Sequence, residues 1–381
     1  MLSSSSEHWG AEALTPLERY FESRGSSWCQ PLPGLRLPHR FTHPQEEHLA
    51  TRRSAGIFDF SFMACIELSG PGSRAFLHRL QTRNLSHLKR GRIAYTLLLR
   101  HDGTVLNDAT VWCFDDGHYA LFTGRRSDLS HIRRVAADFD VVLDNRSDAH
   151  AVIAVQGPLA SRIVSSVIDQ PAPDLPYFGF WSTEFGGKAC WIARMGYSGE
   201  SGFELLVPAA EGPALWQALR RKGGGLDVLE CGFAAMNSLR IEAGHLLFSN
   251  ELALEVTPYE LGFTRLVDLY PHDFIGISRL RQQRWAVPDR RLVGLLPAVP
   301  ADPGFGTPPS HANPEKAEGI LTSACYSPLL RRWIGMGYVN STLVPEGHRP
   351  GTRLLLSNGI TAIVARLPFY DPGRRIPRSA D

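Results

Sequence analysis

The sequence lacks paired cysteines, long apolar runs and a secretory signal. Its six cysteines are scattered over 381 residues without a Cys-x-x-Cys pair, which argues against a zinc ribbon or a dense disulfide framework and is typical of a reducing compartment. No apolar run approaches the ~20 residues that a membrane span requires. The polar start MLSSSSEHWGAEAL has neither the basic nor the apolar region of a secretory signal. We therefore expect a soluble, cytoplasmic protein that does not enter a membrane.

A strong charge of either sign is also missing. The formal net charge is +2, with 20% charged and 43% hydrophobic residues, so the composition offers no electrostatic footprint for nucleic acid or a membrane surface. The histidines form no His-Glu-x-x-His motif, and the sequence contains no Gly-x-Ser-x-Gly motif. These absences argue against a metal site and against a serine hydrolase. We expect neither a nucleic-acid partner nor a bound metal.

The order of strand and helix signals indicates an α+β protein. Two or three domains are expected for a chain of 381 residues. Strand-like and helix-like segments alternate up to a Pro- and Gly-rich stretch at residues 286–318, which we predict to be a linker or a long loop. Beyond it, short strands separated by turn signals predict a small antiparallel β-domain, at residues 320–323, 333–339, 353–356 and 360–367.

Two carboxylates occupy positions where a strand favours apolar residues. Asp108 lies in TVLNDATVW and Glu204 lies in GFELLV, and acidic residues are depleted in strands. One explanation is an edge position that faces water. The other is a partly buried carboxylate, which needs hydrogen-bond donors from the backbone, an arginine or a ligand. A planar ligand with adjacent N–H groups, such as an amino-pyrimidinone edge, would satisfy both carboxylate oxygens.

Three glycines precede Glu204 at every third position. Gly196, Gly199 and Gly202 form the pattern Gly-x-x-Gly-x-x-Gly, and no lysine of a phosphate-binding loop follows. A phosphate cradle is therefore disfavoured. We predict instead a turn that needs positive φ at several of these positions.

Several segments in fixed order resemble one known family. They are EEHLATRRSAGIFDFSFM, AVQGPLA, ARMGYSGESGFELLVP, NSLRIEAGHLLFSNELALEVTPYELGF and GILTSACYSPLLRRWIGMGYV, together with the long block around TVLNDATV. Over nearly its whole length the chain resembles the aminomethyltransferase (glycine cleavage T-protein) family, whose members handle one-carbon units on tetrahydrofolate. Each motif is modest alone, and their shared order is what makes the resemblance specific.

The resemblance implies a three-lobed cloverleaf, with two α+β lobes and a C-terminal antiparallel β-barrel around a central folate-binding hole. We expect residues 1–55 and 140–247 to form the α+β core lobe. Residues 56–139 and 248–282 are expected to form the second α+β lobe, and residues 283–381 the barrel.

The resemblance also implies roles for individual residues. Asp108 matches the essential aspartate beside the reacting folate nitrogens, and Glu204 matches the glutamate that binds the amino-pyrimidinone edge of the pterin. Asn250 and Met236 fall at substrate-binding positions, and no residue matches a metal ligand. The remaining matches are to positions of the folate pocket, at Tyr95, Met63, Tyr197, Trp112 and Thr110.

Two departures from the family pattern bear on the one-carbon donor. Met236 stands where an arginine is usual, and Ile277 stands where a lysine is usual, so partners for an anionic substrate or folate tail are lost. We therefore expect a transferase that moves a methyl or methylene group between tetrahydrofolate and a small amine, ether or thioether. The alternatives are aminomethyl transfer from a lipoylated carrier protein, a repurposed enzyme that has abandoned folate, and a folate-binding regulator, against which the retained Asp108 speaks.

Overall fold

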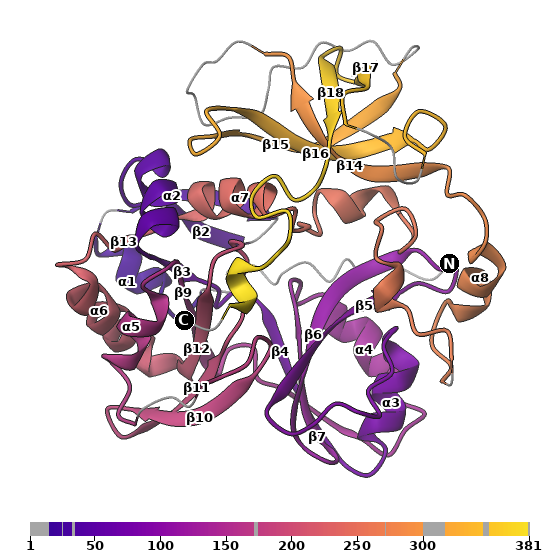
Figure 1. Ribbon diagram of the computed structural model, residues 1–381. Helices are drawn as coiled ribbons and strands as arrows, with labels where there is room; N and C mark the ends of the chain where they lie inside the picture. Colours follow the sequence, from indigo (N-terminus) through magenta and orange to yellow (C-terminus); the bar gives the residue numbers. More distant parts are fainter. Residues whose placement is uncertain are drawn as a thin grey trace, which may run out of the picture.

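The computed structural model describes residues 15–24, 26–32, 35–170, 174–270, 272–299, 317–345 and 350–379. Within these ranges the strands form a two-stranded sheet, a six-stranded sheet and two five-stranded sheets. The three larger sheets organise three lobes around a common centre (Figure 1). The protein is thus an α+β protein of three lobes, as the sequence predicts.

The first lobe is built on the six-stranded sheet, whose strand order is β10-β11-β12-β9-β3-β13. In β12, Leu205 and Val207 belong to one apolar cluster, and Leu206 belongs to a second cluster that also contains Trp112 and Phe122 of the next lobe. Successive side chains of a strand point to opposite faces. Glu204 therefore shares the face of Leu206, which is turned toward the second lobe.

The strands of the first lobe are β1 (Ser27–Leu32), β2 (Leu35–Arg40), β3 (Gly56–Asp59), β9 (His150–Gln156), β10 (Phe180–Phe185), β11 (Lys188–Ala193), β12 (Gly202–Pro208) and β13 (Leu229–Glu230). Its helices are α1 (Glu18–Glu22), α2 (Pro44–Arg53), α5 (Ala160–Ser165), η1 (Ala209–Glu211), α6 (Gly212–Gly223) and α7 (Phe233–Glu242). Helix α7 packs on α2 and on the C-terminal sheet, so it joins two lobes.

The second lobe is built on a five-stranded sheet of order β5-β6-β7-β4-β8. In β6, Ala109, Val111 and Cys113 pack in the core of this lobe, whereas Trp112 packs in the cluster shared with the first lobe. The alternation of side chains therefore places Asp108 on the shared face, in line with Trp112. Both carboxylates that the sequence singles out face the boundary between the lobes.

The strands of this lobe are β4 (Ala64–Ser69), β5 (Arg92–Leu99), β6 (Val105–Asp115), β7 (His118–Thr123) and β8 (Val142–Asn145). Its helices are α3 (Ser73–Leu80), α4 (Asp128–Ala136), η2 (Glu251–Leu254), η3 (Thr264–Leu266) and α8 (Ile277–Gln283).

The C-terminal lobe is an antiparallel sheet of order β15-β16-β14-β18-β17. Its strands are β14 (Arg290–Pro297), β15 (Gly319–Ser327), β16 (Arg332–Asn340), β17 (Arg353–Leu355) and β18 (Thr361–Ala365). Backbone hydrogen bonds from Glu318 N to Leu355 O (2.8 Å) and from Ser357 N to Gly319 O (2.9 Å) link β15 to the segment around β17. These bonds bring one end of β15 beside the segment that follows β17, and the antiparallel β-domain that the sequence predicts is present.

After β18 the chain returns toward the centre of the molecule. The amides of Phe369 and Tyr370 donate to Glu242 O at 2.8 and 2.9 Å. Further along, the Arg194 guanidinium donates to Ser379 O, beyond the short helix η5 (Ile376–Arg378). Figure 1 shows this segment running down between the two α+β lobes. Residues 369–379, the last that the structure describes, therefore contribute to the centre and not to the C-terminal sheet.

Strand pairing refines the expected lobe boundaries. Strand β3 pairs with β9 of the first lobe, and β8 pairs with β4 of the second lobe. We therefore propose that the second lobe begins after β3 and ends after β8. The predicted linker at 286–318 contains β14, and its residues 300–316 lie outside the described part of the chain.

Candidate functional site

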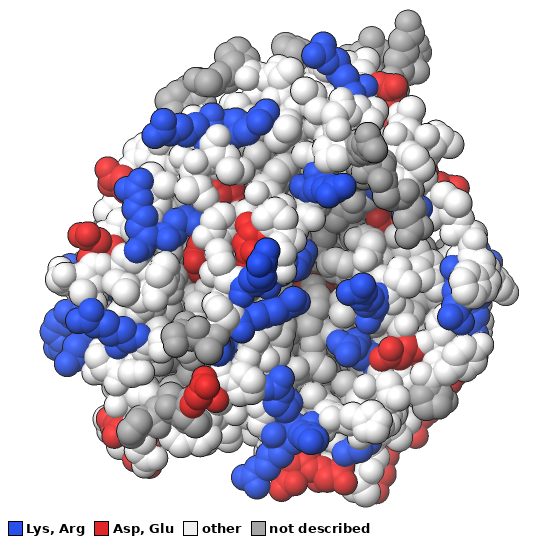
Figure 2. Space-filling model, viewed as in Figure 1, with Lys and Arg blue, Asp and Glu red and all other residues white. Residues whose placement is uncertain are grey.

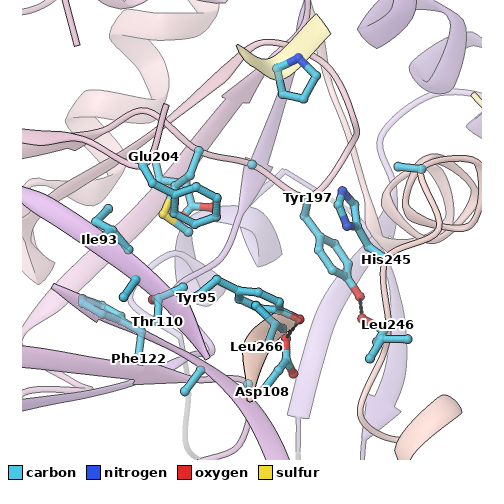
Figure 3. Close-up of a pocket in the computed structure, with 18 of the residues that line it drawn as sticks. Ile93, Tyr95, Asp108, Thr110, Phe122, Tyr197, Glu204, His245, Leu246 and Leu266 are labelled. Carbon is cyan, nitrogen blue, oxygen red and sulfur yellow. Dashed lines mark hydrogen bonds between the residues drawn. The ribbon is translucent and has the colours of Figure 1, made fainter. Parts of the chain in front are cut away.

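A cavity of about 1210 Å³ lies where the lobes meet. Its walls come from the shared faces of the two α+β lobes and from the returning C-terminal segment. Single ligand pockets usually measure ~300–1,000 Å³, so this cavity has room for a ligand together with part of a second reactant. Figure 3 shows the centre of the cavity, with Glu204 on one side and Asp108 on another.

Glu204 is a buried carboxylate without a protein partner. Its side chain is 3% exposed, its backbone is held by β9 and β11, and none of the described residues forms a hydrogen bond or ion pair with its carboxylate. Burial raises the pKa of Glu204 to about 7, because a charge without a donor is costly in an apolar wall. A carboxylate in this state favours a ligand that supplies hydrogen-bond donors.

Asp108 is paired with Tyr95 across the cavity wall. The Tyr95 hydroxyl donates to Asp108 Oδ2 at 2.9 Å (Figure 3). Burial raises the pKa of Asp108, and the hydrogen bond from Tyr95 lowers it in part. Burial and the neighbouring carboxylate raise the pKa of Tyr95 well above its usual value, so Tyr95 remains a donor. Held by Tyr95, the Asp108 carboxylate can lie next to a reacting nitrogen of a ligand and can accept a proton from that nitrogen.

Apolar and aromatic side chains form the rest of the wall. The Trp112 indole donates to Thr110 Oγ1 at 3.1 Å, which fixes the ring against the sheet. The Tyr197 hydroxyl donates to the carbonyl of Leu246, and the Tyr197 ring meets Phe60 edge to face at 6.5 Å between centroids. Flat walls of this kind suit a flat heterocycle.

The structure gathers most of the residues that the sequence predicts for the site. Eight of them line the cavity, namely Asp108, Glu204, Tyr95, Met63, Tyr197, Trp112, Thr110 and Met236. Asn250 does not line it, because its side-chain amide donates to Thr322 O (3.2 Å) and to Ser323 Oγ (3.1 Å) of the C-terminal sheet. Its role in substrate binding stays a prediction.

The structure changes the argument about the one-carbon donor, which the sequence analysis based on the cations missing at Met236 and Ile277. Ile277 is 3% exposed and packs in the apolar core under α8, away from the cavity. The cavity wall does contain Met236, but it also contains six basic side chains from other segments, at Arg83, Lys89, Arg92, Arg265, Arg374 and Arg378. The two departures therefore do not leave the cavity without cations.

Two lining residues escaped the sequence analysis. His245 lies in the quoted motif EAGHLL, where a histidine within an apolar run is the only local signal. Arg374 lies in DPGRRIPR, a polar stretch with no periodic pattern. Only the path of the folded chain brings this stretch to the cavity.

The glycine-rich turn differs from its prediction. Of its three glycines only Gly199 has a positive φ, at 82°. A Cβ at Gly196 or Gly202 would lie 1.8 or 2.3 Å from the side chain of Gln156. The prediction of positive φ at several positions was therefore wrong, since two of the glycines make room for a buried glutamine and not for an unusual backbone conformation.

Within the described residues, no group of three or more His, Cys, Asp or Glu side chains is arranged to hold a metal ion. None of the described helices combines the length and the apolar character that crossing a membrane requires.

Comparison with known proteins places the chain in one family. Residues 18–270 match the GCVT N-terminal domain, and residues 290–371 match the glycine cleavage T-protein C-terminal barrel domain. The aminomethyltransferase of Cutibacterium acnes is 35% identical, over 93% of this chain and 98% of its own length. That of Rubrobacter xylanophilus is 33% identical, over 97% of both chains. The crystal structure of the glycine cleavage system aminomethyltransferase T from Bartonella henselae superposes with a TM-score of 0.82 at 27% identity, over 94% of this chain and 98% of its own. The chain therefore belongs to the aminomethyltransferase (glycine cleavage T-protein) family of one-carbon transferases.

Proposed function

We propose that the protein transfers the carbon of an aminomethyl group from a lipoylated carrier protein to tetrahydrofolate. Tetrahydrofolate is the cosubstrate of aminomethyltransferases in this family. The observation that carries the assignment to this chain is Glu204, a buried carboxylate that faces the cavity and lacks a protein donor. The amino-pyrimidinone edge of the folate head offers two adjacent N–H donors, which match one carboxylate.

The side chains around Glu204 also fit the folate head. Ile93, Trp112 and Phe122 of the second lobe belong to the apolar cluster that the two lobes share, and they line the same cavity. A planar ring system would pack on these faces while its polar edge meets Glu204. We propose that Glu204 binds the polar edge of the pterin and that Trp112, Tyr197 and Met63 form the flat walls against which the pterin packs.

We assign the chemical role to Asp108. When bound, tetrahydrofolate would supply the two nitrogens that receive the carbon, while the C–S bond to the lipoyl group and the C–N bond of the aminomethyl group break, and the protons of the two folate nitrogens leave with the thiol and with ammonia. Asp108, in its carboxylate form, orients one of these nitrogens, takes up the proton that it loses and stabilises positive charge on the transferred group. The hydrogen bond from Tyr95 holds the carboxylate in place and offsets part of the rise in the pKa of Asp108 that burial causes.

The family relatives favour the carrier protein over a free small molecule as donor. The expectation of a free amine, ether or thioether rested on the loss of cations at Met236 and Ile277. Ile277 lies in an apolar core, and six other cations line the cavity, which removes the physical basis of that expectation. The relatives that match nearly the full chain carry the name aminomethyltransferase.

Folate binding is tested by calorimetry with tetrahydrofolate. We expect Glu204→Gln to weaken binding about tenfold to a hundredfold, because a charged acceptor of two hydrogen bonds is lost. The matched control is Glu184→Gln, on an exposed position of β10 in the same sheet, which should bind like the unchanged protein. Equal affinities for the Glu204 variant and the unchanged protein would contradict the pterin assignment.

The donor is tested by single-turnover transfer to tetrahydrofolate. A lipoylated carrier loaded with an aminomethyl group should support transfer, and the same carrier without its lipoyl group should not. Transfer from free methylated amines at a comparable rate would favour the small-molecule alternative instead.

A further inference from the structure

Asp108 lies at the point of β6 where one neighbouring strand ends. Strand β7 ends at Thr123, which pairs with the residue after Asp108, so residues 105–108 of β6 extend beyond β7. Asp108 itself pairs with Leu97 of β5, and Leu97 bonds to Thr82 through its own N–H (3.4 Å) and C=O (3.1 Å). In such a strand pair the backbone groups of the two residues point away from each other. The N–H of Asp108 therefore points to the side on which β7 has ended.

Side chains replace the strand at this point. Asn107 Oδ1 accepts from Asp108 N at 2.9 Å, and the Arg125 guanidinium donates to Leu106 O at 2.7 Å. Asp128, the first residue of α4, joins these two side chains. Its Oδ2 accepts from Asn107 Nδ2 at 2.5 Å, and its Oδ1 forms an ion pair with Arg125 at 2.9 Å. One connected group, the Asn107–Arg125–Asp128 cluster, therefore holds the backbone of β6 at Asp108.

The cluster is buried behind the cavity wall. Asn107 is 0% exposed and Asp128 is 3% exposed. Because successive side chains of a strand alternate, Asn107 points away from the face of Asp108. Asp108 lines the cavity, whereas Asn107, Arg125 and Asp128 do not. The cluster therefore reaches the cavity through Asp108 and does not contact a ligand itself.

Asp128 and Arg125 place opposite charges behind the same carboxylate. Burial raises the pKa of Asp128, and Arg125 and Asn107 lower it, so the pairing favours the ionised form. Burial also raises the pKa of Asp108; Asp128 adds to this rise and Arg125 opposes it. The two charges of the pair therefore act on Asp108 in opposite directions.

Two tyrosines face Asp108 from the cavity side. Tyr95 of β5 donates to it at 2.9 Å, and Tyr197, in the turn before β12, has a pKa that burial and Asp108 raise. Both hydroxyls therefore stay protonated at neutral pH. The Lys and Arg side chains that Figure 2 shows near the centre of this face lie at the surface, where water and salt screen their charges. The charges of Asp128 and Arg125 lie beneath the wall and are screened much less.

We propose that Asp128 and Arg125 are positioning residues for the transfer reaction. Through Asn107 and Leu106 they fix the backbone on both sides of the Asp108 N–H, and together they leave almost no net charge behind its carboxylate. This inference rests on the proposed function, because it takes Asp108 as the carboxylate beside the reacting nitrogen. The anchoring and the charge can be tested separately, since Asp128→Asn keeps an acceptor oxygen and removes the charge.

Single-turnover transfer from the loaded carrier to tetrahydrofolate, followed over pH, tests the charge balance. The rate falls on the acid side as Asp108 takes up a proton. Asp128→Asn leaves the Arg125 charge unbalanced, so the acid limb should move to lower pH by about 0.5–1 unit. Adding Arg125→Met to this variant removes both charges and should return the limb to within about 0.3 unit of the unchanged protein. The matched control is Asp116→Asn, which breaks an exposed pair with Arg74 in the same lobe and should leave the limb in place.

Asn107→Leu tests the anchoring of the backbone. The substitution removes the hydrogen bonds to Asp108 N and to Asp128, so the carboxylate of Asp108 should be displaced. The transfer rate at the high-pH plateau should fall about tenfold or more, while the affinity for tetrahydrofolate by calorimetry stays within about twofold. A loss of folate affinity in the same proportion as the rate would show that Asn107 supports the fold alone, and would contradict its part in positioning.

An acid limb in Asp128→Asn that coincides with that of the unchanged protein overturns the proposal, as does a double variant that keeps the shift of the single variant. The pKa of Asp108 can also be followed without a reaction, from the carboxyl carbon resonance in the NMR spectrum that is missing in Asp108→Asn. The same shifts are expected there. Failure of the proposed function looks different, because the unchanged protein then gives no transfer from the loaded carrier. The carboxyl titration in that case decides whether Asp128 and Arg125 set the pKa of Asp108.

Discussion

Two sets of buried carboxylates in this protein have contrasting surroundings. At the junction of α2, α7 and the C-terminal sheet, Glu242 forms an ion pair with Arg52 (2.8 Å). Glu251 forms an ion pair with Arg240, also at 2.8 Å. At the cavity, no side chain of the described residues pairs with the Glu204 carboxylate, and the Asp108 carboxylate accepts a hydrogen bond from the Tyr95 hydroxyl at 2.9 Å. Both groups are shielded from solvent, yet only the first is neutralised by basic side chains from the protein itself.

The presence or absence of a cationic partner sets the pKa of these buried carboxylates. In the first group the partners hold three segments together, and hydrogen bonds and charges lower the pKa of Glu242 despite its burial. In the second group burial dominates and raises the pKa of both carboxylates. A carboxylate without a cationic partner destabilises the fold. We propose that a ligand supplies the hydrogen-bond donors that such a carboxylate lacks at the cavity.

Replacing Asp108, the carboxylate to which we assign the chemical role, should give the largest effect. Asp108→Asn keeps the shape and removes the charge, so single-turnover transfer to tetrahydrofolate should slow about 10²–10⁴-fold, with little change in folate affinity. The control is Asp115→Asn, an exposed residue at the end of the same strand. Unchanged transfer in the Asp108 variant would remove it from the mechanism.

Breaking a pair of the first group should affect stability instead of chemistry. Arg240→Met leaves Glu251 buried and unpaired, so the free energy of unfolding in urea should fall by about 3–5 kcal/mol. Arg220→Met is the contrast, because Arg220 pairs with Glu230 at 3.3 Å from a side chain that is 57% exposed, and its loss should cost about 1 kcal/mol or less. If the two variants lose similar stability, the distinction between buried and surface pairs does not hold here.

The unpartnered carboxylate should show itself in the pH dependence of stability. The pKa of Glu204 rises from 4.5 to about 7 on folding, so the unfolded chain ionises first as the pH rises. The stability that the protonated form contributes is complete below pH 4.5 and is lost as the pH rises to about 7. As the pH rises between these values, the free energy of unfolding of Glu204→Gln should therefore increase by about 3 kcal/mol relative to that of the unchanged protein.

Urea unfolding of both proteins at pH 5 and pH 8, without ligand, measures this gain. Two parallel stability profiles would mean that the Glu204 carboxylate is not destabilised by burial in the way that its surroundings indicate.

The sequence singles out the two strand-borne carboxylates of the cavity and leaves open whether they face water or a ligand, and the structure shows the face on which each one lies. A period of two places Asp108 on the face of Trp112 and Glu204 on the face of Leu206, and both faces meet at the lobe boundary. The resemblance to the family then supplies the arrangement of the lobes, which local patterns cannot specify. The α+β class and the terminal β-domain follow from the order of strand and helix signals alone.

Features set by distant contacts were beyond reach of the sequence. Gly196 and Gly202 are required by Gln156 on another strand, so their spacing carries no sign of the cause. Ile277 matches a position that is usually a cation, and only the packing of α8 shows that it lies outside the cavity. The route of Arg374 depends on backbone hydrogen bonds to Glu242 and on Arg194, which leave no periodic pattern.

The smallest expected effect concerns the hydrogen bond from Tyr95 to Asp108. In Tyr95→Phe the hydrogen bond that lowers the pKa of Asp108 is lost, so that pKa should rise further and the acid limb of the transfer rate should move to higher pH. At neutral pH the loss of rate should be about twofold to tenfold, the value of one ordinary hydrogen bond. Tyr270→Phe, at a side chain 66% exposed on the same lobe, should leave the profile in place. A variant that is slower at every pH by the same factor would show that Tyr95 shapes the cavity without tuning the carboxylate.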